Sequence, residues 1–206
     1  LAERLTLGGL EVKGIDQIGA DWDPTKIFVG RVVSVRQHPD ADRLVLVTVD
    51  YGAEAPMEVV TGAPNLHVGD VGPKVVFAIA GARLIDGHSD APRTITLKKS
   101  KIRGVPSEGM VCSEKELGIS EAHEGIIILP DDAPTGQPFQ AYWGDAVLDV
   151  DLTPNLARCY SMAGVAREVA ALLDTPVSLP DVQPPAEGQP IEGQVEVEIA
   201  DPDLCP

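Results

Sequence analysis

Short β-rich runs separated by turn residues fill the middle of this chain and limit the folds open to it. The runs are 27–36, 44–51, 57–61, 74–80, 93–97, 110–112 and 126–129. Gly, Pro and Asp lie between them, and little helical periodicity intervenes to make the crossovers that parallel strands need. Closely spaced short strands of this kind are typical of a small antiparallel barrel. We therefore expect mainly β structure, with five main strands closing into a barrel.

A dense group of cations lies within this region. Lys98, Lys99, Lys101 and Arg103 fall close together in a chain whose formal net charge is -16. Like charges at this density repel one another, so such a run is usually solvated on an exposed loop or strand edge. The alternative is a patch that contacts phosphates and gains salt-dependent affinity for a nucleic-acid backbone. Charge alone favours the solvated face and leaves the phosphate patch open.

The acidity of the chain is unevenly distributed. Residues 26–145 hold 12 Lys or Arg against 16 Asp or Glu, whereas the two ends together hold 4 against 16. Most of the negative charge therefore lies outside the barrel segment. This distribution weakens the objection that an acidic protein binds nucleic acid poorly at physiological salt.

The residues after the cations predict a strand followed by a short helix. Met110–Cys112 is an apolar run that suits a buried strand. Ser113 and Glu116 have the spacing of a capping box, in which each side chain satisfies an open backbone donor at a helix start. Gly118 lies where a helix of one turn would end. We predict a loop, a strand and a one-turn helix here.

Three motifs in this region resemble a known family. They are IRGVPSEGMVCSEKELGI at 102–119, HPDADRL at 38–44 and TGAPNLHVG at 61–69. Together they resemble the tRNA-binding OB domain near the start of the bacterial phenylalanyl-tRNA synthetase beta chain. Related domains are appended to some methionyl- and tyrosyl-tRNA synthetases or occur as free-standing tRNA-binding proteins.

Segments outside the barrel favour the phenylalanyl beta chain among these relatives. The stretch DLTPNLARCYSMAGVAREVAALL at 151–173 resembles the helical segment that follows the OB domain in that family, and LAERLTLGGLEV at the start resembles the segment before it. The final DPDLCP resembles the opening of the next, editing domain. The family commonly has Arg and Asp where this chain has Leu156 and Arg158, so the resemblance implies no role for this turn.

The combined pattern predicts an OB-like antiparallel β-barrel inserted in a small α+β domain formed by the two ends of the chain. The barrel domain is expected over 26–146, and the α+β domain over 1–25 and 147–190. Its elements would be a short helix at 1–7, strands at 12–18 and 148–152, and a helix at 161–173 that Ser161 caps. An aromatic group at 139–144 would cap the barrel. Residues 191–206 would be the truncated start of the editing domain, with a last strand at 195–199.

Several function classes find no support in the sequence. There is no phosphate-binding GxxxxGK[ST] loop, no dinucleotide fingerprint and no nucleophile elbow, so we expect no catalytic residue in this chain. The three cysteines and four histidines lack metal-ligand spacing, so we expect no metal site. No apolar run approaches the length of a membrane span, and a reduced, cytoplasmic protein is expected.

The family resemblance supplies the remaining expectations. It implies a partner alpha subunit in an alpha2-beta2 heterotetramer, tRNA as a ligand, and ATP and magnesium for the whole enzyme, with no cofactor in this segment. The candidate RNA-binding residues are Lys98, Lys99, Lys101, Arg103, Arg36 and Arg43.

The mode of RNA contact is limited by the scarcity of aromatic residues. Besides histidine, the strands and turns of 27–129 contain only Phe28, Tyr51 and Phe77, and at least two are expected to pack inside. We therefore expect contacts to the RNA backbone rather than stacking on bases. Two alternatives stay open at this point: a free-standing or appended tRNA-binding module, and a structural docking domain whose cations face an acidic protein.

Overall fold

The computed structural model describes residues 1–206 apart from 88, 90, 92, 184–187, 189, 190, 192 and 201–206. The chain forms two compact units, one built from residues 10–151 and the other from residues 3–9 with the chain that follows 151. The predicted motif DPDLCP, and with it Cys205, lies outside the described residues. The predicted domain boundaries at 25/26, 146/147 and 190/191 stay predictions.

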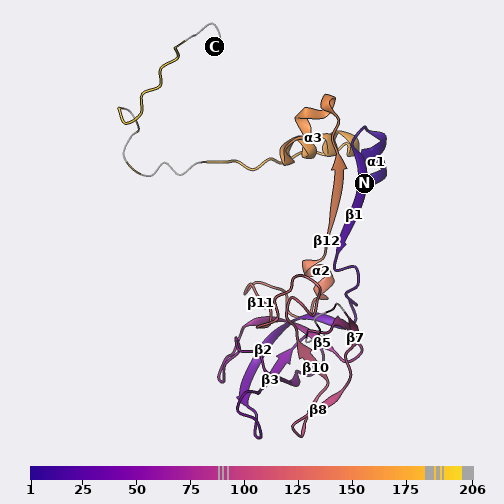
Figure 1. Cartoon of the computed structure of the whole chain (residues 1–206), viewed down its shortest axis with the longest axis vertical. Coiled ribbons are helices and arrows are strands. Elements are labelled where there is room, and N and C mark those ends of the chain that lie inside the picture. Colours follow the sequence, from indigo (N-terminus) through magenta and orange to yellow (C-terminus); the bar gives the residue numbers. More distant parts are fainter. Residues whose placement is uncertain are drawn as a thin grey trace. The chain divides into compact units, whose positions relative to one another are not determined.

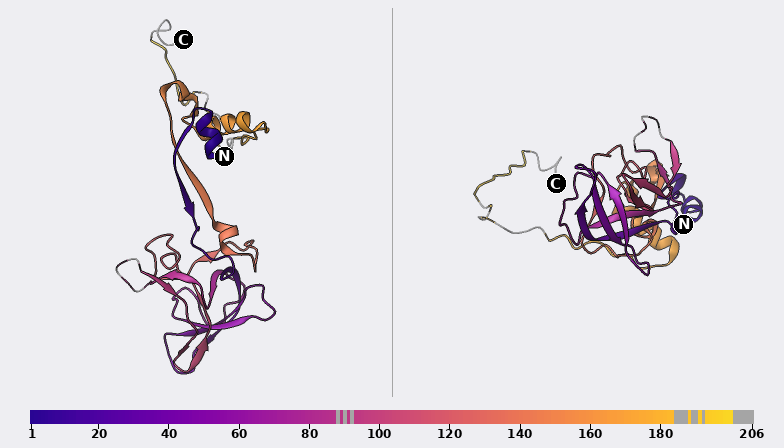
Figure 2. Two further views of the ribbon diagram at one scale, coloured as in Figure 1. Left: turned by 90° about the vertical axis from the view of Figure 1, so that its right-hand side faces the viewer. Right: turned by 90° about the horizontal axis from the view of Figure 1, so that it is seen from below.

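Five antiparallel strands form the barrel of the larger unit (Figure 1). They are β2 (Ile27–Gln37), β3 (Val45–Asp50), β4 (Met57–Thr61), β5 (Lys74–Ile79) and β10 (Gly109–Val111). Their order is β10-β5-β2-β3-β4, and β10 also lies beside β4, so the sheet is nearly closed. A short strand, β11 (Ile128–Leu129), pairs antiparallel with the first residues of β5. This arrangement confirms the predicted OB-like barrel, and Figure 2 shows it from two further directions.

Buried side chains cover both faces of the barrel sheet. Val47 and Phe77 belong to a cluster with members from all five strands, which fills the barrel interior. Val29 and Val76 belong to a second cluster, in which the outer face of β2 and β5 packs against Phe139. Successive strand residues point to opposite faces, so the neighbours Val76 and Phe77 belong to different clusters. Glycine is required at position 109, where β10 pairs with β5. A Cβ there would lie 2.7 Å from the Ala78 carbonyl oxygen and 2.8 Å from Phe77.

Two hairpins occupy the connection from β5 to β10. The first pairs β6 (Arg83–Ile85) with β7 (Thr94–Thr96), and the second pairs β8 (Ser100–Ile102) with β9 (Val105–Ser107). The predicted strand at 93–97 is confirmed by β7. Strands β6, β8 and β9 are not among the predicted runs.

The capping box forms, but the predicted one-turn helix does not. The Glu116 carboxylate accepts hydrogen bonds from the backbone N–H of Ser113 at 2.7 Å and from its hydroxyl at 2.9 Å. Residues 114–118 make successive hydrogen-bonded turns instead of an α-helix. A single turn fixes several residues for few hydrogen bonds, and Gly118 ends it with a φ of 71°.

A two-stranded ribbon and a short helix complete the larger unit. β1 (Glu11–Ile18) pairs antiparallel with β12 (Asp145–Asp151), which confirms both predicted strands. The helix α2 (Phe139–Trp143) carries the predicted aromatic group. Phe139 is fully buried, its ring lies 4.7 Å from that of Trp22, and both pack in the cluster that covers the outer face of β2 and β5.

The smaller unit is helical. It contains α1 (Ala2–Leu7), the 3-10 segment η1 (Pro154–Cys159) and α3 (Met162–Leu173). The Ser161 hydroxyl accepts a hydrogen bond from the Gly164 N–H at 3.1 Å, which confirms the predicted N-cap. Arg158, one of the two departures from the family pattern, donates to Glu168 at 2.7 Å. The predicted strand at 195–199 is wrong, because these residues have no strand structure.

Candidate nucleic-acid interface

The turn that joins β2 to β3 is linked to the β8–β9 hairpin by one buried histidine. His38 is only 2% exposed. Its Nδ1 accepts a hydrogen bond from the backbone N–H of Asp40 at 3.0 Å, and its Nε2 lies 3.2 Å from the carbonyl oxygen of Ile102. Because Nδ1 is the acceptor, a neutral ring carries its proton on Nε2 and donates it to Ile102. The HPDADRL turn and the hairpin are therefore joined through both edges of a single ring.

The hairpin turns at two residues with unusual backbone geometry. Ile102 pairs with Val105, and Arg103 and Gly104 between them have φ of 47° and 87°. A two-residue turn with both φ positive suits the twist of antiparallel strands and normally contains Asn-Gly or Asp-Gly. Arg103 holds a left-handed conformation that costs an ordinary side chain about 1 kcal/mol. The tip of the hairpin thus presents a strained, exposed cation.

The other end of the hairpin is anchored to the barrel wall. Ser107 is 3% exposed, and its hydroxyl accepts from the Val60 N–H at 3.2 Å and donates to the Gly109 carbonyl at 3.1 Å. Leu46 and Val60 pair across β3 and β4 and are buried, although neither belongs to the two barrel core clusters. β9 lies beside β4, so the hairpin packs against the barrel wall at these residues.

The six predicted cations fall into two classes. Lys99 pairs with Glu108 at 2.5 Å, and Arg36 pairs with Glu58 across β2 and β4. Within the described part of the chain, Lys98, Lys101, Arg103 and Arg43 are exposed and have no ion-pair partner. Arg43 lies on the turn that His38 joins to the hairpin of Lys101 and Arg103. The structure therefore brings the candidate residues onto adjoining segments, and their contact with RNA stays a prediction.

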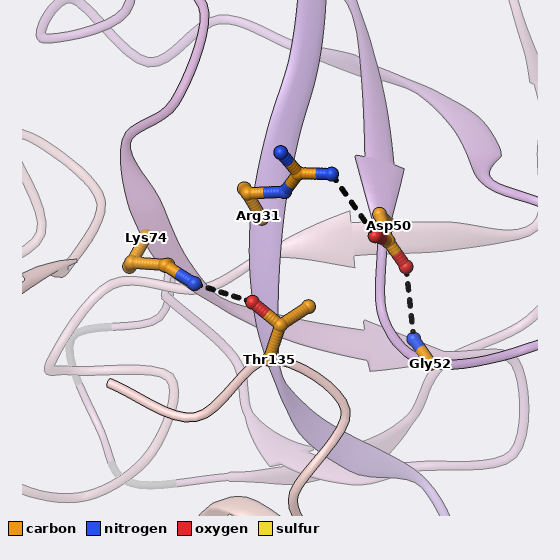
Figure 3. Close-up of polar contacts among 5 residues, drawn as sticks. All are labelled: Arg31, Asp50, Gly52, Lys74 and Thr135. Atoms are coloured by element: carbon orange, nitrogen blue, oxygen red, sulfur yellow. Dashed lines mark hydrogen bonds and ion pairs between the residues drawn. The ribbon is translucent and has the colours of Figure 1, made fainter. Parts of the chain in front are cut away.

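Two further cations of the barrel are occupied by neighbouring side chains (Figure 3). Arg31 of β2 and Lys74 of β5 are register partners on neighbouring strands, and their side chains point to different partners. Arg31 approaches Asp50 at 3.4 Å, and the other carboxylate oxygen of Asp50 accepts from the Gly52 N–H at 3.1 Å. Lys74 donates to the Thr135 hydroxyl. These contacts give Arg31 and Lys74 structural partners that the hairpin cations lack.

Aromatic residues of the barrel pack together rather than forming a stacking surface. The ring of Tyr51 lies 5.7 Å from Phe28 and 5.1 Å from Phe77, which is fully buried. The HPDADRL turn and the segment 98–109 contain no Phe, Tyr or Trp. The surface around the hairpin therefore offers charge and backbone donors instead of π-faces for bases.

Two residues of this region were missed by sequence reasoning, although the motifs contained a signal. His38 has no metal-ligand spacing in the sequence, but in the structure it is buried and connects two loops. Asn65, in the motif TGAPNLHVG, donates to the Ile126 carbonyl at 2.8 Å and accepts from its N–H at 3.0 Å. Both residues hold loops to the barrel through hydrogen bonds that only the folded chain brings together.

The described residues form neither a metal site nor a membrane-spanning helix. No group of three or more His, Cys, Asp or Glu side chains is placed to hold a metal ion. No described helix is long and apolar enough to cross a membrane.

The chain is similar to known proteins over its whole length. Residues 27–138 match the family model described as a putative tRNA binding domain. The phenylalanine–tRNA ligase beta subunit of Dehalococcoides mccartyi strain 195 is 47% identical over 207 residues, covering all of this chain and 24% of that protein. The beta subunit of Salinibacter ruber is 43% identical and is covered to 25%. The chain thus spans about a quarter of the length of these relatives.

A solved structure also aligns with part of the chain. The MetRS related protein from Pyrococcus horikoshii is 23% identical with a TM-score of 0.37, covering 54% of this chain and 86% of that protein. The family assignment rests on the sequence matches. The chain belongs to the tRNA-binding domain family, in the form carried by the beta subunits of bacterial phenylalanine–tRNA ligases.

Proposed function

We propose that this chain is a non-catalytic, tRNA-contacting region of a phenylalanine–tRNA ligase beta subunit. The observation that carries the proposal is a set of exposed cations, without ion-pair partners among the described residues, on two segments joined by His38. Arg43 lies on the β2–β3 turn, and Lys101 and Arg103 lie on the β8–β9 hairpin. In OB barrels, oligonucleotides bind at the loop between the first two strands and the loop between the last two. Those are the two connections that carry these cations here.

The contacts are made with phosphates rather than with bases. Each Lys or Arg that neutralises a phosphate releases counterions, so the affinity falls steeply as salt rises. The absence of aromatic residues from both segments supports backbone recognition, which suits a folded RNA with double-stranded arms. Lys99 and Arg36 contribute less, because Glu108 and Glu58 already neutralise them.

The activity of the whole enzyme belongs to parts that this chain does not span. In the proposed assembly, the beta subunit pairs with an alpha subunit in a cytoplasmic alpha2-beta2 heterotetramer that joins phenylalanine to tRNA. ATP and magnesium act in that assembly and outside this chain. The relatives' names support the ligase assignment, and the barrel contributes tRNA binding or assembly to it.

Binding of a tRNA transcript to the 206-residue chain tests the proposal. Fluorescence anisotropy is measured from low to physiological salt for the wild type and for the variant Lys101→Gln/Arg103→Gln. We expect a linear fall of the logarithm of the affinity with the logarithm of salt, and a slope reduced by about 2 in the variant. The control Arg83→Gln/Arg167→Gln removes two other exposed cations and is expected to keep the wild-type slope.

Two results would count against the proposal. No wild-type binding at low salt would reject tRNA contact and favour a structural docking domain. Equal losses in the two double variants would show that overall charge, and not the hairpin, governs binding.

A further inference from the structure

We propose that His38 is a positioning residue that holds the β2–β3 turn and the β8–β9 hairpin together, so that their cations bind RNA as one site. This inference rests on the proposed function. It assigns a role to a residue that does not itself face the RNA, because its ring is 2% exposed.

The first step of the argument is that the hairpin needs external support. Its strands have three residues each. An isolated two-stranded hairpin is marginal in water, and this one contains the left-handed Arg103 at its turn. Ser107 fixes one end of the hairpin to β4. Ile102, which receives the His38 hydrogen bond, immediately precedes Arg103 at the other end.

The second step is that the same ring also fixes the turn that carries Arg43. Nδ1 accepts from the Asp40 N–H at 3.0 Å, which closes the turn after Pro39. A side chain with one polar group could hold only one of the two partners. The imidazole holds both, since its two nitrogens lie on different edges of a rigid ring. His38 thus joins the turn that carries Arg43 to the residue next to the hairpin cations, whereas Gln37 holds the turn and Ser107 holds the hairpin separately.

The third step is energetic. Phosphate contacts from two independent segments each require the segment to be ordered on binding, and that ordering reduces the affinity. Segments that are already joined need less ordering on binding, so they lose less affinity. Cutting the His38–Ile102 link should thus weaken RNA binding without removing any charge.

Two substitutions separate the two edges of the ring. Glutamine places an amide donor near the position of Nε2 and can keep the Ile102 contact. Asparagine places its oxygen near the position of Nδ1 and can keep the Asp40 contact, but it is too short to reach Ile102. The proposal predicts that His38→Asn lowers tRNA affinity about tenfold, whereas His38→Gln changes it less than threefold. If only the contact with Asp40 mattered, His38→Gln would lower tRNA affinity more than His38→Asn.

A double-mutant cycle adds a readout specific to positioning. Because the hairpin cations act through a placed hairpin, Lys101→Gln/Arg103→Gln should cost much less affinity in the His38→Asn background than in the wild type. The salt slope of His38→Asn should fall toward that of Lys101→Gln/Arg103→Gln, although no charge has been removed.

The experiment is a set of tRNA titrations on the full chain, with circular dichroism melts of every variant. Wild-type affinity and salt slope in a folded His38→Asn would overturn the inference and leave the proposed function standing. If His38→Asn does not fold, His38→Gln decides, because a tenfold loss in a folded His38→Gln would also overturn it. Failure of the wild type to bind tRNA would reject both the proposed function and the inference.

Discussion

Arg103 and Gly104 form the two-residue turn of the β8–β9 hairpin with φ of 47° and 87°. Asparagine tolerates the left-handed region far better than arginine does. In the proposed function the positive charge of Arg103 faces a phosphate, which would explain an unfavourable residue at this position. The proposal therefore predicts that the hairpin tip gives up stability for binding.

The substitution Arg103→Asn tests this trade. We expect it to raise the free energy of unfolding by roughly 0.5 to 1 kcal/mol, because it removes strain, and to lower tRNA affinity. Urea unfolding and anisotropy titrations measure the two effects. Arg103→Lys is the control, since it keeps both the charge and the strain. Loss of stability in Arg103→Asn would contradict this interpretation of the turn.

Gly109→Ala should destabilise the barrel. The added Cβ would lie 2.7 Å from the Ala78 carbonyl oxygen and 2.8 Å from Phe77, so β10 must move away from β5. Overpacking of this kind costs about 1 to 3 kcal/mol, measurable by urea unfolding. Gly14→Ala is the matched control, because its Cβ would meet only Asp149 at 3.9 Å. Equal effects of the two substitutions would show that β10 tolerates the shift.

Removal of the Asn65 side chain should destabilise the fold, because two backbone groups of Ile126 lose their hydrogen-bond partner. Asn65 satisfies both the N–H and the carbonyl of Ile126. Asn65→Ala leaves both groups without this partner, at a cost of about 2 kcal/mol in the free energy of unfolding. The Asp side chain in Asn65→Asp can accept a hydrogen bond but cannot donate one. Its free energy of unfolding should therefore differ from that of Asn65→Ala. No change in Asn65→Ala would mean that water replaces the amide.

Cys112 should resist thiol reagents in the folded chain. Burial raises the pKa of its thiol well above the usual value, and the nearby Glu116 carboxylate acts in the same direction. The thiolate is the reactive form, so alkylation at pH 8 should be negligible until the barrel opens. Peptide mass spectrometry after iodoacetamide treatment, with and without urea, measures the labelled fraction. Rapid labelling without urea would show that β10 opens locally.

The Arg158–Glu168 pair should give the smaller unit an acid-sensitive contribution. The hydrogen bond from Arg158 lowers the pKa of Glu168, and its positive charge acts in the same direction. A depressed pKa stabilises the fold above the unfolded-state value, and this contribution is lost as the pH falls through the folded-state value. The difference in melting temperature between the wild type and Glu168→Gln should therefore shrink as the medium is acidified. A difference that grows toward acid pH would contradict the sign.

The barrel could be predicted because the local sequence of each main strand favours β structure. The predicted runs 57–61 and 74–80 contain β-branched residues, are bounded by turn residues and correspond to β4 and β5. The same local signal failed at 195–199, where alternating valines and glutamates form no strand. An alternation of apolar and polar residues predicts a strand only where a partner strand is available to pair with it.

The hairpin that carries the candidate site could not be predicted in the same way. Each strand has three residues, β9 contains Pro106, and Arg-Gly is an unusual sequence for its turn. Its conformation depends on His38, which reaches it from the β2–β3 turn, and on the bond between Ser107 of β9 and Val60 of β4. Sequence reasoning located the cations, and the fold determined which of them are unpaired.

The position of the unpaired cations also has a kinetic consequence. The barrel segment is acidic in total, yet Lys101, Arg103 and Arg43 gather on two joined segments. Residues 98–103 carry four cations and no carboxylate, so a polyanion is attracted to them and repelled by carboxylates elsewhere, including Asp40 and Asp42 beside Arg43. In the proposed function, encounters with tRNA are thereby oriented toward the hairpin before any contact forms.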